Sequence, residues 1–433
     1  MSRLMTRQHP RLEPFRPGRD GVFGLKEAAR LHRRFAFGRR ADGLRADVSA
    51  GLDACLDAIF SEADEDSPDS ARYRKLVAMG PQVARSGNLE VLQAQWFARC
   101  VSAPRALGER LAFFWHDHFA TGADKVKDLS AMEAQNALFR RLGGGRFPTL
   151  LAAASRDPAM LVWLDNATSD KRHPNENFAR ELLELFCLGI GNYGERDVVE
   201  CARAFTGWRL HRGRFCFDRG AHDPGLKSIL GHEGRFSGDD VLQILAADPR
   251  CARFIATGLY REFVADVVED DLGSALGQVL VAHDFAIRPF LRELAASKAF
   301  FEAGFRIAAP VELLIGAMRS LDAGHSASRL VHHARKLGQE PYRPPDVAGW
   351  RGGRAWINSS TLIARRNFAA EVGAGEDGPL SLRLADDWQA DEECLTAALT
   401  GRAPLGEGPR PRSSRKPELA AAQVLDRPEA WLI

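Results

Sequence analysis

The stretch NENFARELLELFCLGIGNYGERDVVECARAFTGWR, from Asn175 to Arg209, decides the fold class of this 433-residue chain. At about 100° per residue, Phe178 and Leu182 share one helical face, and further apolar side chains fill most of the remainder. A second apolar pattern with helical spacing follows from about residue 197. Two nearly apolar helices in succession predict a mainly α-helical protein with a large core.

Polar residues of the first helix are confined to one arc, which holds Asn177, Arg180, Glu181 and Glu184. If the apolar remainder is buried, two carboxylates, an amide and a guanidinium point into a shared interior or cleft. Charges in such a place need partners. A carboxylate held there suits general acid or base chemistry, or metal ligation.

A purely structural interpretation explains the start of this helix. Asn175 follows Pro174 and is suited to cap the helix, and Glu176 favours its positive end. Arg180 would pair with a carboxylate four residues away, either Glu176 or Glu184. The same interpretation does not explain charges in mid-helix, so we expect a functional site there.

The second helix of the stretch is expected to extend the same site. We predict that it begins at Asp197, as its cap, and that Glu200 and Arg203 bring an ion pair to the shared interior. Arg209, just beyond the helix, would add another guanidinium.

Helical spacing continues through most of the chain, and Pro310 is placed to start another helix. The best strand candidate is Gly207–Asp218, a short hairpin with Arg212 and Gly213 at its turn. We therefore predict a large irregular multi-helix domain over residues 25–372. It would follow a basic amino-terminal arm at 1–24 and precede a linker and small helical segment at 373–433.

The motif WHDHF, from Trp115 to Phe119, suggests a metal site because two histidines flank an aspartate. In a continuous helix His116 and His118 would lie about 200° apart and could not chelate one ion. That geometry predicts a core His118 and a surface His116. If the helix instead ends near Asp117, both imidazoles could join Glu181 as ligands of a divalent metal, the one cofactor that the sequence suggests.

Two later motifs carry further candidates. HDPGLKSILGH places His222, Asp223 and Lys227 in a loop, where they could bind a phosphate or carboxylate, or transfer a proton. The alternative is a loop stapled by local hydrogen bonds. PDVAGWRGGRAWINSSTLIARRNF adds Trp350 and Arg365, which suit a carbohydrate or polymer surface, or the closing of a core.

Together with RRFAFG at 33–38, these motifs resemble the bacterial family catalogued as domain of unknown function 1800, over most of residues 25–370. The resemblance implies a shared fold and site. Genes of that family commonly lie beside genes of a second family, domain of unknown function 1501, whose members look like alkaline-phosphatase relatives. A protein partner of that type is therefore implied.

Composition sets the outer bounds. The chain is 45% hydrophobic and 27% charged, as in ordinary soluble proteins, and it has no apolar run of the roughly 20 residues that a membrane span needs. Seven cysteines without a CxxC pair and the absence of a signal-peptide pattern predict a cytoplasmic protein, although many relatives look exported. A formal net charge of +2 argues against a surface that generally coats nucleic acid.

The leading hypothesis is a hydrolase or transferase. Its predicted catalytic residues are His116, His118, Glu181, Glu184, His222 and Asp223. Its predicted substrate-binding residues are Asn177, Arg180, Arg203, Arg209, Lys227, Trp350 and Arg365. The rival is a non-catalytic binding or assembly protein that holds an anionic or glycan polymer, or a partner. An enzyme requires the His and Glu side chains to converge, whereas a binding protein tolerates a spread row of Arg and Trp.

Overall fold

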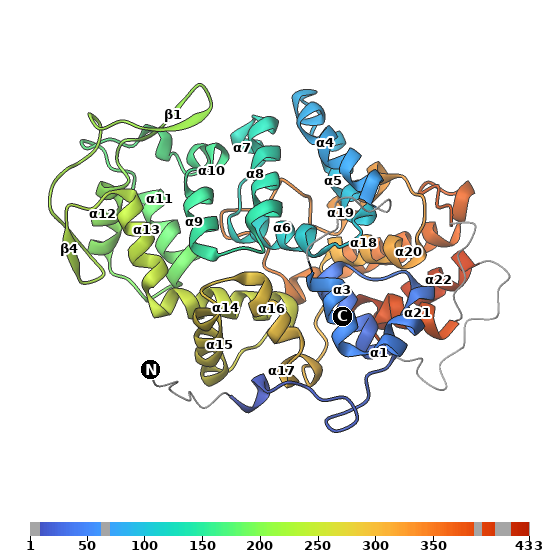
Figure 1. The fold of residues 1–433 in the computed structure, drawn as a ribbon. Helices are drawn as coiled ribbons and strands as arrows, with labels where there is room; N and C mark the ends of the chain where they lie inside the picture. The colour runs from blue at the N-terminus through green and yellow to red at the C-terminus, as the bar shows by residue number, and fades with distance from the viewer. Residues whose placement is uncertain (1–8, 62–69, 385–391, 403–416, 433) are drawn as a thin grey trace.

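The structure is a computed structural model that describes residues 9–61, 70–384, 392–402 and 417–432. The described chain is mainly α-helical, as the sequence predicts, with two small antiparallel sheets (Figure 1). The first helices are α1 (Leu25–Ala36), α2 (Leu44–Ala50), α3 (Leu52–Phe60), α4 (Ala71–Arg85), α5 (Leu89–Ser102), α6 (Leu107–His118), α7 (Ala123–Val126), α8 (Leu129–Leu142), α9 (Phe147–Ser155) and α10 (Pro158–Trp163).

The middle of the chain holds two of the motifs, at 175–209 and 222–232, and all the strands of the described residues. Its elements are α11 (Glu176–Glu181), the π-helix η5 (Leu182–Leu188), α12 (Glu195–Ala204), β1 (Trp208–His211), β2 (Arg214–Phe217), β3 (Lys227–Ile229) and β4 (His232–Gly234). The remaining helices are α13 (Gly238–Ala247), α14 (Pro249–Phe263), α15 (Asp270–Ala282), α16 (Ile287–Ala295), α17 (Lys298–Phe301), α18 (Pro310–Leu321), α19 (Ala327–Lys336), α20 (Ser359–Gly373), α21 (Glu392–Thr400) and α22 (Pro417–Leu425).

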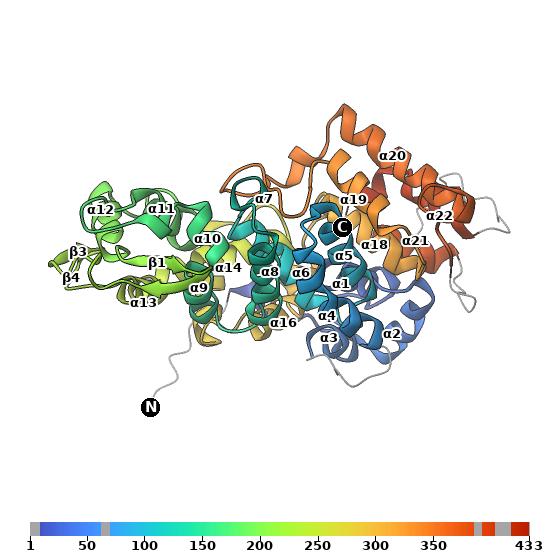
Figure 2. The same cartoon turned by 90° about the horizontal axis from the view of Figure 1, so that it is seen from above.

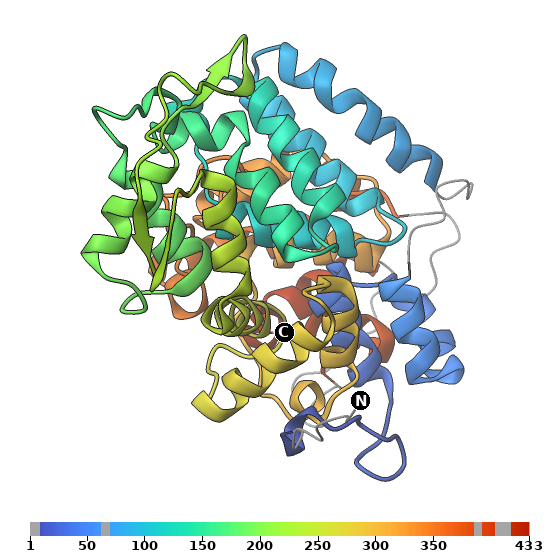
Figure 3. The same cartoon turned by 60° about the vertical axis from the view of Figure 1, so that its left-hand side comes forward.

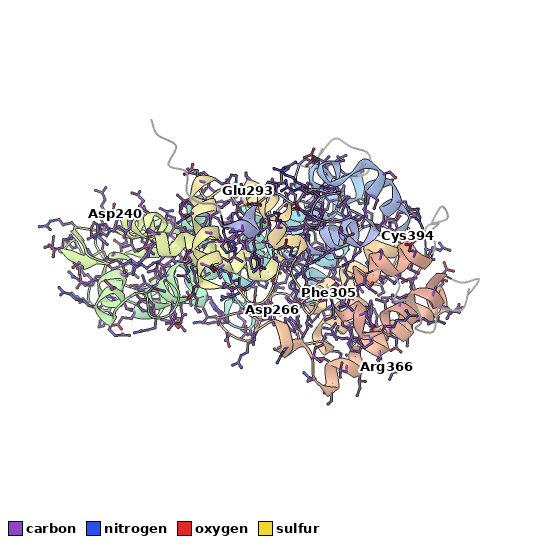
Figure 4. All side chains as sticks on the ribbon, turned by 90° about the horizontal axis from the view of Figure 1, so that it is seen from below. Asp240, Asp266, Glu293, Phe305, Arg366 and Cys394 are labelled. Atoms are coloured by element: carbon purple, nitrogen blue, oxygen red, sulfur yellow. The ribbon has the colours of Figure 1, made fainter. Side chains whose placement is uncertain are left out.

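Helices from the two ends of the chain pack together. α21 lies against α1 and α18, and α22 lies against α20, so blue and red segments are neighbours in Figure 2. The hairpins and α11–α13 form the opposite end of the molecule, which Figure 3 brings forward. In Figure 4, Asp240 of α13 and Arg366 of α20 mark these two ends. No helix of the described residues is long and apolar enough to cross a membrane.

The predicted hairpin forms as expected, and its turn lies at Arg212 and Gly213. Both residues have positive φ, at 50° and 72°, which is the backbone of a type I′ turn. That turn matches the right-handed twist of the flanking strands, so a two-residue connection suffices. Its cross-strand pairs run from Trp208 opposite Phe217 to His211 opposite Arg214.

One predicted helix boundary was met closely and one was wrong. α6 ends at His118, one residue beyond Asp117, with the Phe119 amide donating to the Trp115 carbonyl. α12 begins at Glu195 rather than with Asp197 as its cap. Asp197 sits in the first turn instead, where its carboxylate accepts from the Gly194 amide at 2.9 Å. Acidic side chains stabilise both positions, so the sequence pattern did not separate them.

The predicted motif helix changes its winding in the middle. α11 begins after Asn175, whose side-chain oxygen accepts from the Asn177 and Phe178 amides, as the capping prediction requires. From Leu182 to Leu188 the chain is π-helical. Such segments are rare and are frequent at functional sites. The wider winding also changes which side chains share a face from Glu181 onward.

Candidate functional site

Three distant motifs meet at the carboxyl end of α6. The His116 Nε2 atom accepts from the Tyr342 amide at 3.1 Å, and the Asp117 Oδ1 atom accepts from the Trp350 amide at 2.7 Å. The His118 Nε2 atom contacts the Phe186 carbonyl of η5 at 3.1 Å. The 342–350 segment and the π-helix are therefore fastened to three consecutive side chains of WHDHF.

The two histidines have opposite tautomers and separate partners. A carbonyl only accepts, so His118 carries its proton on Nε2, whereas His116 accepts there and carries its proton on Nδ1. Burial lowers the pKa of His116 to about 3 and that of His118 to about 4. Both imidazoles are thus neutral at physiological pH and are held by the main chain.

The continuous-helix interpretation predicted a surface position for His116, but the structure contradicts it, because the side chain is only 2% exposed. Its ring packs near Trp96, Tyr342 and Trp350, with centroids 5.5–5.8 Å away. The 342–350 segment covers the outer face of α6, which a local helical pattern cannot reveal. His118 contacts aromatic rings on other elements, including Phe254 and Phe186.

Asp117 is a candidate that our sequence analysis missed. Burial raises the pKa of its carboxyl to about 7, the Trp350 amide opposes this shift, and Glu262 adds to it. Asp117 thus has the pKa of a group that can exchange protons near neutrality. The available signal in the sequence was its place between two histidines in WHDHF.

We expect Asp117→Asn to become more stable relative to wild type as the pH rises. The folded pKa of about 7 lies above the ordinary 3.8, so the stabilisation is complete below pH 3.8 and is lost as the pH rises through 7. Asparagine keeps the acceptor for the Trp350 amide but cannot ionise. Urea unfolding should show a relative gain of about 4 kcal/mol between pH 4 and pH 8, at about 1.36 kcal/mol per pKa unit.

Exposed Asp53→Asn provides the control for removing one negative charge. A stability difference between Asp117→Asn and wild type that stays constant over this pH range would contradict the prediction.

Carboxylates gather beside this junction. Glu181 is half-buried, and its side chain makes no hydrogen bond or ion pair with any described residue. Burial raises the pKa of Glu181, Glu184 adds to the shift, Arg180 opposes it, and Asp346 adds further. Asp346 lies in the Pro345–Phe368 motif, and its proximity shows that this motif reaches the α11–η5 helix.

Neighbouring side chains of α11 and η5 have defined partners. The Tyr193 hydroxyl donates a hydrogen bond to Glu184. Burial raises the pKa of Tyr193 to about 12, and this hydrogen bond adds to the shift. Arg180 forms a two-pronged ion pair with Glu195 at 2.8 Å, not with Glu176 or Glu184 as predicted. Asn177 is exposed. Arg180 thus joins α11 to α12, because the turn between them returns Glu195 to its side.

The predicted metal ligands are not brought together. His116 and His118 use their Nε2 atoms on different segments, and Glu181 lies on another helix. Within the described ranges, no group of three or more His, Cys, Asp or Glu side chains is arranged to hold a metal ion.

The 222–232 segment, predicted as a loop, contains β3 and the first residue of β4, and its side chains form a separate cluster through local hydrogen bonds and ion pairs. Lys227 is 1% exposed and donates to the Asp223 and Gly225 carbonyls at 2.6 and 3.1 Å. Arg203 pairs with Asp223 and with Glu200, at 2.8 and 2.7 Å. His222 contacts the Thr206 carbonyl through Nδ1 at 3.0 Å. These side chains therefore bind one another and the nearby main chain, and none of them forms a hydrogen bond or ion pair with Glu181.

The remaining predicted binding residues are also occupied elsewhere. Trp350 is 9% exposed and Arg365 is 1% exposed, and Arg365 donates to the Ala308 carbonyl at 3.1 Å. Arg209 lies 3.6 Å from Asp218 and 3.9 Å from Asp170, beside the hairpin.

A pocket of about 300 Å³ opens next to the site, where the end of η5 meets α14 and α15.

Comparisons with known proteins add one finding. A family model described as "Protein of unknown function (DUF1800)" matches residues 30–431, which is nearly the whole chain. No curated protein matches, and neither does any solved structure.

Proposed function

Because the chain belongs to the family of proteins of unknown function DUF1800, we propose a function from its own site: a hydrolase or transferase that works through the carboxyl groups of Glu181 and Glu184. The observation that carries the proposal is Glu181 itself. It is half-buried on the polar arc of a helix whose other faces are apolar, and its side chain forms no hydrogen bond or ion pair with a described residue. A charge without a partner is costly in such a place, which supports a reacting or ligand-binding role.

The two carboxyl groups have different surroundings. Burial and the neighbouring Glu184 and Asp346 raise the pKa of Glu181, which suits a proton donor. Glu184 accepts a hydrogen bond from Tyr193, so its orientation is fixed. Paired carboxyl groups in unlike environments are the arrangement that separates an acid from a base or nucleophile. We assign the role of proton donor to Glu181 and the role of base or nucleophile to Glu184.

The histidines of the leading hypothesis have positioning roles in this proposal. His118 binds the Phe186 carbonyl and so ties α6 to the π-helix that follows Glu181. Asp117 and His116 fasten the 342–350 segment, which carries Asp346. His222 and Asp223, by contrast, stabilise the separate loop cluster.

A non-catalytic binding or assembly function is the second candidate. The observation that favours it is that the imidazoles of His116, His118 and His222 all contact main-chain groups and do not converge. A protein partner of the domain of unknown function 1501 type belongs to this candidate. We retain a cytoplasmic location as a prediction, consistent with seven free cysteines.

The deciding experiment is turnover of nitrophenyl esters, phosphoesters and glycosides by wild type and Glu181→Gln. General acid or base catalysis typically contributes about 10²–10⁴ in rate, so we expect kcat to fall at least about 100-fold. Activity should also fall as the pH rises through the raised pKa of Glu181, because the donor is then deprotonated.

Glu176→Gln, an exposed carboxyl in the first turn of the same helix, is the matched control and should retain activity. Unchanged turnover in Glu181→Gln would refute the assignment of the acid. Absence of turnover together with saturable binding of a substrate analogue would favour the second candidate.

A further inference from the structure

The β1–β2 hairpin has two chemically different faces. Its register places Trp208, Leu210, Phe215 and Phe217 on one face, because directly paired residues point the same way. Trp208 and Phe215 pack 5.1 Å apart, and the Arg156 guanidinium covers both rings, so this face turns toward the body.

The other face is cationic. It carries Arg209, His211, Cys216 and Arg214, and Arg212 sits at the turn. Arg209 and Arg214 are diagonal neighbours, and His211 lies directly opposite Arg214. The Arg209 and Arg214 guanidinium groups carry like charges and repel one another at this spacing.

Five cations on and beside the hairpin lack a side-chain partner among the residues that the structure describes. All are exposed, and none makes a side-chain hydrogen bond or ion pair with a described residue. They are Lys171, Arg172, Arg212, Arg214 and Arg219. The loop that carries the first two lies against the base of the hairpin, where the Lys171 amide donates to the Ala221 carbonyl at 2.8 Å.

Two acidic residues that adjoin these cations in the chain, Asp170 and Asp218, do not neutralise the five. Asp170 accepts from the Arg172 and His173 amides, and Asp218 accepts from the Gly220 amide. Both lie next to Arg209, at 3.9 and 3.6 Å. Their charges thus hold the two turns and Arg209 in place, and the surrounding cations keep an excess of positive charge.

We infer that this basic hairpin surface, formed by Lys171, Arg172, Arg212, Arg214 and Arg219, binds the phosphate backbone of duplex nucleic acid. Its turn stands out from the body of the molecule in Figures 1 and 3. A two-stranded ribbon fits the major groove, which is about 12 Å wide. Bound phosphates would relieve the repulsion among the cations.

The composition of the surface favours phosphate over other anions. Four of its five cations are arginine, whose planar fork binds phosphate in a two-pronged manner. A regular duplex presents about one charge per 1.7 Å of its axis and can engage several of them at once. The overall charge of +2 is no obstacle, because the excess is local.

Fluorescence anisotropy with a labelled 20-base-pair duplex DNA tests the inference. We expect wild type to bind with an affinity that falls steeply with salt. The combined variant Arg212→Gln, Arg214→Gln, Arg219→Gln should bind at least about 30-fold more weakly, and the log–log salt slope should shrink by about 2.7 if three phosphate contacts are lost.

A second variant, Lys171→Gln with Arg172→Gln, tests the neighbouring loop and should shrink the slope by about 1.8. The matched control removes three exposed arginines elsewhere, Arg85, Arg351 and Arg354, and should change the slope little. Absent duplex binding, binding that survives both hairpin-region variants, or preference for heparin or polyglutamate over duplex would each overturn the inference. None of these results depends on turnover at Glu181.

Discussion

Replacing Glu312 by alanine is expected to lower the free energy of unfolding by about 3–5 kcal/mol, one of the two largest losses of stability that we predict. Glu312 is 5% exposed and binds two buried arginines from different segments. Arg110 of α6 approaches within 2.5 Å and Arg306 within 2.9 Å. The Ala309 amide also donates to Glu312, at 2.8 Å, at the start of α18.

The expected loss is large because the arginines would remain. Arg110 would keep Glu262, at 2.5 Å, but Arg306 would lose its carboxylate in the interior. Removing one member of a buried ion pair leaves an uncompensated charge, which costs more than the pair itself contributes. α1 would also be affected, since Arg110 donates to the Arg34 carbonyl at 3.2 Å.

Urea unfolding of Glu312→Ala and Glu312→Gln at pH 7 measures this effect. Burial raises the pKa of Glu312, but the charges of Arg306 and Arg110 outweigh burial and hold it well below the ordinary 4.5. The stabilisation is therefore present above pH 4.5 and is lost as the pH falls through the lowered pKa. The difference from wild type should shrink on acidification.

Asp426→Ala breaks an exposed pair with Arg366 and should cost less than about 1 kcal/mol. Equal losses in the free energy of unfolding for Asp426→Ala and Glu312→Ala would contradict the prediction that the buried cluster stabilises the fold more than an exposed ion pair does.

Glu109→Ala is expected to cost about 3–5 kcal/mol for a related reason. Both side chains of the Arg99–Glu109 pair are fully buried, and the Arg99 Nε atom lies 2.6 Å from the carboxylate. Tyr73 and Trp96 donate to the same carboxylate at 2.9 and 3.2 Å. Alanine would leave three donors without their acceptor.

Calorimetry and urea unfolding of Glu109→Ala and Glu109→Gln separate the two contributions. Glutamine keeps an acceptor oxygen but removes the charge, so its loss should lie between wild type and alanine. Asp57→Ala, which breaks an exposed pair with Arg292, is the control and should cost less than about 1 kcal/mol. A loss for Glu109→Ala no larger than that of the control would contradict the prediction.

The sequence by itself determined the features that depend on near neighbours in the chain. Helical spacing gave the mainly α-helical fold, Asn175 was identified as a cap, and the hairpin turn was placed at Arg212 and Gly213. The motifs indicated the family, whose model matches residues 30–431. The helices, the cap and the hairpin turn depend on backbone geometry over a few residues, and the family assignment depends on short motifs that occur in a fixed order along the chain.

Only the tertiary structure decided which motif residues meet. The local sequence pattern did not show that the Asp117 carboxyl is buried and has a raised pKa. The burial of His116 depends on a segment more than 220 positions away. Arg180 forms its ion pair with Glu195 and not with either of the two carboxylates on its own helix. The His222 loop looked equally suited to catalysis or to local bonding, and its partners at Thr206 and Arg203 settled its geometry. The physical reason is common to all: burial and charge pairing are set by whichever distant segment packs there, and helical periodicity does not encode that choice.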